Sequence, residues 1–214
     1  MDKKRFCQLW MRNLSTGVVV DAESVYELLV TSYSQPQRRY HDSHHIEDCL
    51  AWLDLYRDQI ADPDAAELAL WFHDACYSVD PKGHEQRGAE LLRQLLHTKM
   101  DAARLDKICS LILQTTHQQP PLDSEHALVL DIDLASFARP WAAYLRDTAL
   151  CRAEMGPLAD SDYCACQLGF LRKLISREQI YYHPHFRAEH EAEARSNISR
   201  LITLLENREL DAKP

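Results

Sequence analysis

Apolar residues recur every three to four positions over most of the chain, a spacing that predicts helices. A clear example is the series Ile46, Cys49, Leu50, Leu53 and Tyr56. No segment other than one near residue 130 has a convincing strand pattern. Helices are therefore predicted over 22–33, 44–59, 84–97, 102–117, 140–154, 163–180 and 186–207.

A further helix, in the stretch "AELALWFHDACYSVD" (residues 66–80), is apolar on nearly every side. Such a helix is expected at the centre of the molecule, covered by others. His73 and Asp74 lie next to each other at its end. Burying a carboxylate beside an imidazole costs free energy unless both groups bind a partner. The pair therefore predicts a further group that interacts with both side chains.

The segment "DSEHALVLDIDLASFA" fits two structures. The alternation in "LVLDIDL" suits a strand with Asp131 and Asp133 on one face. The length of the segment and the "LASFA" that follows favour a helix. On a helix, two positions apart is about 200°, so only one of the two aspartates would face a given site.

The composition supports a helical protein of one domain. The chain has 214 residues with only five glycines, and long segments are rich in Ala, Leu, Glu, Arg and Gln. This length is typical of a single domain with a full core. We therefore expect an all-α, single-domain fold over residues 1–214, with its core from about 20 to 207.

The net charge and the cysteine content limit the possible binding partners and the cellular compartment. The formal net charge of −9 argues against a large nucleic-acid interface. The seven cysteines show no disulfide framework and no CxxC motif, which fits a reducing, cytoplasmic location. No run of 18 apolar residues and no signal-peptide pattern occurs, so we expect no membrane association. The sequence leaves open whether the protein forms a homodimer.

Four side chains form the candidate chemistry: His45, His73, Asp74 and one aspartate of "DID", Asp131 or Asp133. Each lies on or at the end of a different predicted helix, apart from the adjacent pair, and packing would bring them together. Two imidazoles and two carboxylates would carry a formal charge of −2. Such a mixed nitrogen and oxygen set suits Mn²⁺, Fe²⁺, Ni²⁺, Co²⁺ or Zn²⁺ better than Ca²⁺.

The stretches "RRYHDSHHIEDCL", "LALWFHDACY" and "LVLDIDLASF" together resemble the H…HD…D motif of the HD-domain superfamily of metal-dependent phosphohydrolases. The chain is more closely similar to its stand-alone bacterial family of predicted metal-dependent phosphohydrolases. The family's E-x-x-AR-x-N element matches "EAEARSN", residues 191–197. The resemblance extends from about Tyr40 to Asn197 and implies an all-α HD-type helical bundle.

The resemblance also implies a metal site and an activity. The ligands would be His45, His73, Asp74 and Asp133, with Asp131 as the alternative to Asp133. The cofactor would be a divalent metal ion such as Mn, Ni, Co, Fe, Zn or Mg. The implied reaction is hydrolysis of a phosphoester or phosphoanhydride in a small phosphorylated molecule, with a nucleotide as the first candidate.

Further roles follow for residues near these motifs. Asp74 would orient the attacking water, and Glu85 would act as general base or orient that water. His117 would donate to the substrate or bind a second ion. Basic residues that flank the motifs are candidate phosphate contacts: Arg38, Arg39, Lys82 and Arg87.

The chain departs from the family pattern at three positions. Asp42 and His84 replace asparagines of the pattern, and Gly88 replaces a serine. Asp42 and Gly88 motivate an alternative, a regulatory protein that binds metal and nucleotide without hydrolysis. A di-iron oxygenase-like chemistry would need additional ligands, and candidates for these are His41, His44 and His117.

Overall fold

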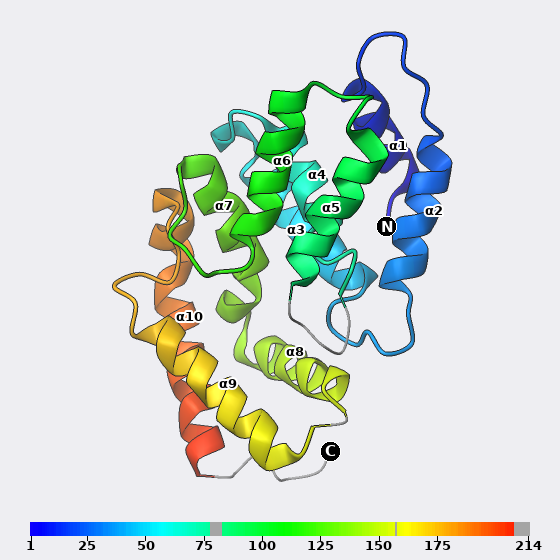
Figure 1. Ribbon diagram of the computed structural model, residues 1–214. Coiled ribbons are helices and arrows are strands. Elements are labelled where there is room, and N and C mark those ends of the chain that lie inside the picture. The colour runs from blue at the N-terminus through cyan, green and yellow to red at the C-terminus, as the bar shows by residue number, and fades with distance from the viewer. Residues whose placement is uncertain (78–82, 157, 208–214) are drawn as a thin grey trace.

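The computed structural model describes residues 1–77, 83–156 and 158–207, which form helices joined by loops (Figure 1). Within these residues the fold has ten α-helices, two 3-10 helices and no β-strand, which confirms the all-α prediction. No described helix has the length and apolar character needed to cross a bilayer. The α-helices are α1 (Lys3–Arg12), α2 (Ala22–Tyr33), α3 (Ser43–Leu55), α4 (Pro63–Phe72), α5 (His84–Leu96), α6 (Ala102–Gln114), α7 (Ser124–Asp133), α8 (Trp141–Glu154), α9 (Asp160–Ile175) and α10 (Pro184–Glu206), and the 3-10 helices are η1 (Arg57–Gln59) and η2 (Ala135–Ala138).

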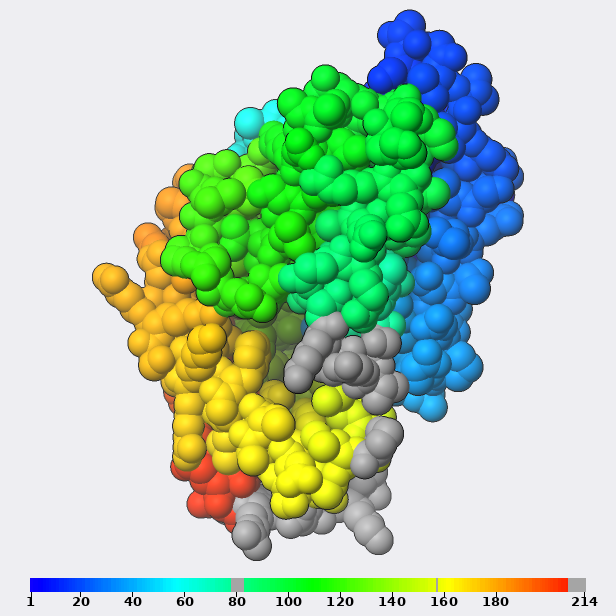
Figure 2. Space-filling view, in the orientation of Figure 1, coloured from blue at the N-terminus to red at the C-terminus, as the bar shows by residue number. Residues whose placement is uncertain are grey.

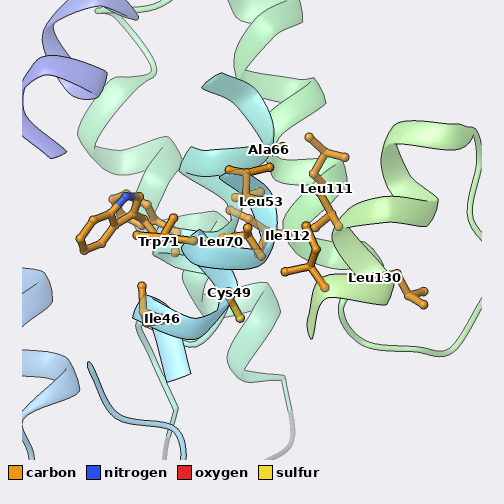
Figure 3. Packing of buried hydrophobic residues seen from close by; sticks show 14 of the residues in the cluster. Ile46, Cys49, Leu53, Ala66, Leu70, Trp71, Leu111, Ile112 and Leu130 are labelled. Carbon is orange, nitrogen blue, oxygen red and sulfur yellow. The ribbon is translucent and has the colours of Figure 1, made fainter. Parts of the chain in front are cut away.

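Helix α4 occupies the centre of the core. Asp62 caps its first turn by accepting a hydrogen bond from the backbone N–H of Ala65, and Pro63 takes its first position, where no intrahelical donor is lost. Every residue from Ala65 to Phe72 is buried. Helices α1, α3, α5, α6 and α7 all contact α4, and Figure 3 shows side chains of α3, α6 and α7 gathered around it.

The core begins earlier in the chain than the expected residue 20. Phe6, Leu9 and Trp10 of α1 are fully buried, and the ring of Phe6 lies edge-on against Trp71 at 5.0 Å. Their spacing of three and one positions is itself helical, so the signal was present in the sequence. Helix α1 therefore belongs to the core.

The ambiguous segment around residue 130 is a helix, α7. Asp123 caps it by accepting hydrogen bonds from the backbone N–H groups of Glu125 and His126. All residues from Glu125 to Ile132 are buried, so no polar face produces a clear helical period. The two aspartates that follow Leu130 therefore have different neighbours, as a helix requires.

Helices α8, α9 and the C-terminal half of α10 lie together at the lower end of the molecule in Figure 1. The helix expected over 163–180 ends at Ile175. Beyond it, the backbone N–H groups of Ile180 and Tyr181 donate to the carboxylate of Glu191 on α10 instead of continuing the helix. This return places α10 against α9 and η2.

Candidate metal centre

His73 and Asp74 follow the last residue of the buried helix α4. The Nδ1 atom of His73 lies 2.9 Å from the carbonyl oxygen of Leu70, so Nδ1–H is the donor. This hydrogen bond leaves the lone pair on Nε2, which is the tautomer that a metal ligand needs. The C-terminal end of α4 thus directs an imidazole nitrogen away from the helix.

Four side chains converge at this nitrogen. The Nε2 atoms of His45 and His73 are 3.3 Å apart. Oδ2 of Asp74 lies 3.2 Å from Nε2 of His73 and 3.6 Å from Nε2 of His45. Oδ1 of Asp133 is 3.4 Å from both imidazole nitrogens. Of these, His45, His73 and Asp74 form a compact buried group that can hold a metal ion.

Helix ends position these residues. Asp42 caps α3 by accepting hydrogen bonds from the backbone N–H groups of His44 and His45, which fixes the first turn that carries His45. Asp133 is the last residue of α7. Because the side chains come from the ends of α3, α4 and α7, the helices themselves fix the geometry of the cluster.

Burial and charge act against each other in the cluster. Burial by itself raises the pKa of Asp74 and Asp133, but nearby imidazoles outweigh it and hold the pKa of each carboxyl well below its usual range. Burial lowers the pKa of His73, yet the charges and hydrogen bonds of Asp74 and Asp133 raise it well above the ordinary value. The two carboxylates are therefore ionised, and a positive charge between them would be stabilised.

The donor set fits a divalent metal ion. The Nε2 atoms of His45 and His73 lie 3.2–3.6 Å from each other and from the nearest carboxylate oxygens of Asp74 and Asp133, which is close enough for one ion to contact several of these atoms. Two imidazole nitrogens with two carboxylates are typical of sites for first-row transition metals. His45, His73, Asp74 and Asp133 would hold the ion.

Three residues of the cluster, His73, Asp74 and Asp133, form the floor of a cavity of about 420 Å³, and His45 lies behind them. The cavity lies between the ends of α4, α6 and α7 on one side and α8 and α9 on the other. In Figure 2 a recess lies between the green and the yellow surfaces, beside the grey atoms. The side formed by η2, α8 and α9 carries aromatic side chains, among them Phe137, Tyr144 and Phe170, together with the carboxylates of Asp147 and Glu154.

No protein-family model, curated protein or solved structure matches this chain. The resemblance to the HD superfamily therefore stays a prediction. The geometry of the cluster and of the cavity does not depend on this resemblance.

Asp131, the alternative ligand, points away from the cluster. Its two carboxylate oxygens accept hydrogen bonds from the backbone N–H groups of Tyr182 and His183, at 2.9 and 2.6 Å. Asp131 is fully buried, and burial raises its pKa to about 7 despite these two hydrogen bonds. Asp131 ties α7 to the start of α10, while Asp133 faces the cluster.

A second layer of side chains surrounds the ligands. Nε2 of His117 lies 2.7 Å from Oδ2 of Asp133, so this imidazole holds the carboxylate that faces the cluster. Nε2 of His84 lies 3.1 Å from Oδ1 of Asp74 and 3.4 Å from Oε1 of Glu85. Such contacts orient ligands and tune their basicity. Glu85 and His117 also line the cavity.

The candidate phosphate contacts have different positions. The guanidinium of Arg38 is buried and donates to the carbonyl oxygens of Asp74 and Ala75, so it fixes the backbone after α4. The side chains of Arg39 and Arg87 are exposed, and Arg87 donates to the carbonyl oxygen of Cys76. None of the three lines the cavity. Lys82 lies outside the described residues.

Glu154 is a site residue that the sequence did not reveal. Its Oε1 atom accepts hydrogen bonds from the backbone N–H groups of Arg39, Tyr40 and His41, each at 2.8 Å. Its Oε2 atom lies 2.6 Å from Nδ1 of His41. Glu154 is more than 100 residues away in the chain, at the end of α8, and no local pattern connects it to the cluster.

The position of His84 beside the cluster could have been predicted from the sequence, because His84 directly precedes Glu85.

Two departures from the family pattern have structural explanations. Asp42 caps α3, as an asparagine would. Gly88 lies where α5 crosses the end of α4, and a Cβ atom there would be 2.3 Å from the carbonyl oxygen of Phe72. A serine would not fit at this crossing. Neither residue removes a polar group from the floor of the cavity.

Proposed function

We propose that this protein is a metal-dependent phosphohydrolase that cleaves a phosphoester or phosphoanhydride bond of a small molecule. The observation that carries the proposal is the convergence of His45, His73, Asp74 and Asp133, the last three of which line a cavity of about 420 Å³. The motif resemblance supports the same activity. A cavity of this size suits a nucleotide or a smaller phosphorylated compound.

A divalent ion held by these four residues would supply Lewis-acid stabilisation for a phosphoryl oxygen and for the attacking water. Glu85 lines the cavity, and His84 links its carboxylate to Asp74. Glu85 is therefore placed to accept the proton of the water as the new P–O bond forms. In-line attack then breaks the bond from phosphorus to the leaving oxygen.

The leaving oxygen requires a proton when its bond to phosphorus breaks. The imidazole of His41 lines the cavity, and its Nδ1 atom is held by Glu154. A carboxylate on one ring nitrogen fixes the tautomer and strengthens the imidazole as a proton carrier. His41 is placed to donate this proton from its other nitrogen, Nε2.

The structure gives local roles to the two residues that motivated the regulatory alternative. That alternative rested on Asp42 and Gly88, which have structural roles at the cap of α3 and at the crossing of α4 and α5. The di-iron alternative would need further metal ligands; among its candidates, Nε2 of His117 contacts Asp133 and Nδ1 of His41 contacts Glu154.

A substrate screen tests the proposal. Purified protein with Mn²⁺, Ni²⁺, Co²⁺ or Mg²⁺ is incubated with nucleotides and simple phosphoesters, and released phosphate is measured. We expect turnover with at least one metal, and a loss of 100-fold or more in His73→Ala and Asp74→Asn. The matched control is His97→Ala, because His97 is an exposed histidine at the end of α5.

The same measurements distinguish the metal-dependent mechanism from its alternatives. Wild-type rates in metal-free His73→Ala would overturn the metal-dependent mechanism. Nucleotide binding without phosphate release under every metal would favour the regulatory alternative. Circular dichroism confirms in each case that the helical fold is retained.

A further inference from the structure

The end of the cavity that is remote from the cluster is built from aromatic rings. Phe137 follows α7, Tyr144 is on α8, and Tyr163 and Phe170 are on α9; all four line the cavity. The ring centroid of Phe137 lies 5.6 Å from that of Tyr144 and 6.2 Å from that of Phe170. Phe170 is 40 % exposed, although a large apolar side chain is usually covered. An aromatic ligand would cover it.

The same wall carries a hydroxyl group without a partner. Tyr163 is 7 % exposed, and its buried hydroxyl has no hydrogen-bond partner among the described residues. The hydroxyl of Tyr144 also makes no such hydrogen bond, and Thr148 beside it donates instead to the backbone carbonyl of Tyr144. Buried hydroxyl groups normally have partners, since an unsatisfied one is destabilising. A polar atom of a ligand would satisfy the hydroxyl of Tyr163.

We infer that the aromatic end of this cavity binds a planar ring with a hydrogen-bond acceptor on its far edge. The substrate would then be a phosphomonoester with an aromatic or heteroaromatic leaving group. That the ligand carries a phosphate rests on the proposed function. That it carries a planar ring rests on Tyr163, Phe137 and Phe170. A volume of about 420 Å³ accommodates one or two fused rings together with a phosphate.

The charge distribution favours one phosphate over several. No lysine or arginine occurs among the described residues that line the cavity. Glu85, Asp147 and Glu154 do line it. Asp147 is paired with Arg139, and Glu154 contacts His41, so neither partner is free to neutralise further phosphates. A polyphosphate chain that extended from the floor toward α8 would therefore meet carboxylates and no lysine or arginine of the described lining. A single phosphate at the cluster avoids this repulsion.

Binding of phosphonates tests the ring site without requiring turnover. Protein loaded with Mn²⁺ is titrated by calorimetry with phenylphosphonate and with ethylphosphonate. We expect phenylphosphonate to bind about 10-fold more tightly, and Phe170→Ala to reduce that preference about fivefold. The matched control is Leu113→Ala, because Leu113 is 39 % exposed and lies outside the cavity.

The hydroxyl is tested by a second pair of ligands. Phenylphosphonate is compared with 4-acetylphenylphosphonate, which carries an acceptor on the far edge of the ring. We expect the acetyl compound to bind about 3- to 10-fold more tightly to the wild type, and Tyr163→Phe to remove this advantage. Tyr163→Phe keeps the ring and so leaves the affinity for phenylphosphonate unchanged.

The results distinguish this inference from the proposed function. Equal affinity for phenylphosphonate and ethylphosphonate, or an equal loss for both in Phe170→Ala, overturns the ring site. Preference for the aromatic ligand without phosphate release from any ester upholds the ring site and overturns hydrolysis. Release of phosphate with no aromatic preference upholds hydrolysis and overturns the ring site.

Discussion

At the scale of single residues, hydrogen bonds to the backbone decide which polar side chains face the cluster. His73 donates from Nδ1 to the carbonyl of Leu70, and this bond turns Nε2 toward His45 and Asp74. Asp131 accepts two backbone N–H groups and so faces away from the cluster. Each of these side chains is buried, and each has a partner that explains its burial.

Asp131 and Asp133 give opposite results when they are replaced. Asp131→Ala leaves the N–H groups of Tyr182 and His183 unsatisfied, so we expect the free energy of unfolding to fall by about 1–3 kcal/mol with unchanged metal content. Asp133→Ala removes a ligand, so metal content should fall sharply. Urea denaturation and elemental analysis measure the two effects. Loss of metal in Asp131→Ala, with full metal in Asp133→Ala, would contradict the assignment.

The sequence was sufficient to name the candidate ligands. The HD resemblance named His45, His73, Asp74 and Asp133, with Asp131 as the alternative, and the structure brings the first four together. The physical reason why Asp131 faces elsewhere lies in the backbone of residues 182–183, which the sequence does not place. Arg38 shows the same limit, since its carbonyl partners become visible only once the chain after α4 is folded against it.

At the scale of helices, the crossing of α4 and α5 determines where the second layer of the site lies. Gly88 allows α5 to approach the carbonyl oxygen of Phe72, which immediately precedes His73. The same helix begins with His84, whose imidazole contacts Asp74. The close approach of the two helices therefore holds His84 against a ligand carboxylate.

Two helical glycines give a matched test of this crossing. Gly88→Ala places a methyl group 2.3 Å from a backbone oxygen, so we expect a loss of about 1–3 kcal/mol in unfolding free energy. Gly169 on α9 has no atom within 4 Å of such a methyl group. Gly169→Ala should therefore stabilise the protein by about 0.5–1 kcal/mol. Thermal or urea denaturation measures both, and equal effects would refute the close approach.

Helix prediction worked where the apolar period was continuous and failed where distant partners end a helix. Helix α5 was expected over 84–97 and spans His84–Leu96. The helix expected over 163–180 stops at Ile175, because Glu191 of α10 binds the backbone N–H groups of Ile180 and Tyr181. That competition depends on α10 and leaves no local trace in the sequence.

At the scale of the whole molecule, Glu154 connects the two sides of the cavity. It extends from the end of α8 to the backbone of residues 39–41, just before the helix that carries His45. Burial raises its pKa, but the hydrogen bonds and charge of His41 and the backbone donors outweigh this and lower the pKa to about 2. Glu154 is therefore ionised, and its charge stabilises the contact between the two sides.

The lowered pKa of Glu154 predicts a pH-dependent contribution to stability. A carboxyl with a pKa of about 2 in the fold and 4.5 as its ordinary value stabilises the fold above about pH 4.5. This contribution is lost as the pH falls from about 4.5 toward 2. At pH 7 we expect Glu154→Gln to cost about 2–3 kcal/mol. Urea denaturation of both proteins measures it, and a difference that stays constant down to pH 2 would contradict the prediction.

We propose that His45, His73, Asp74 and Asp133 hold one divalent ion beside the cavity. An anomalous difference map from crystals of the protein soaked in Mn²⁺ tests this directly. We expect a single strong peak within bonding distance of Nε2 of His45, Nε2 of His73 and the carboxylate of Asp74, with Asp133 beside it. Absence of a peak among these side chains, or a peak bound only elsewhere, would contradict it.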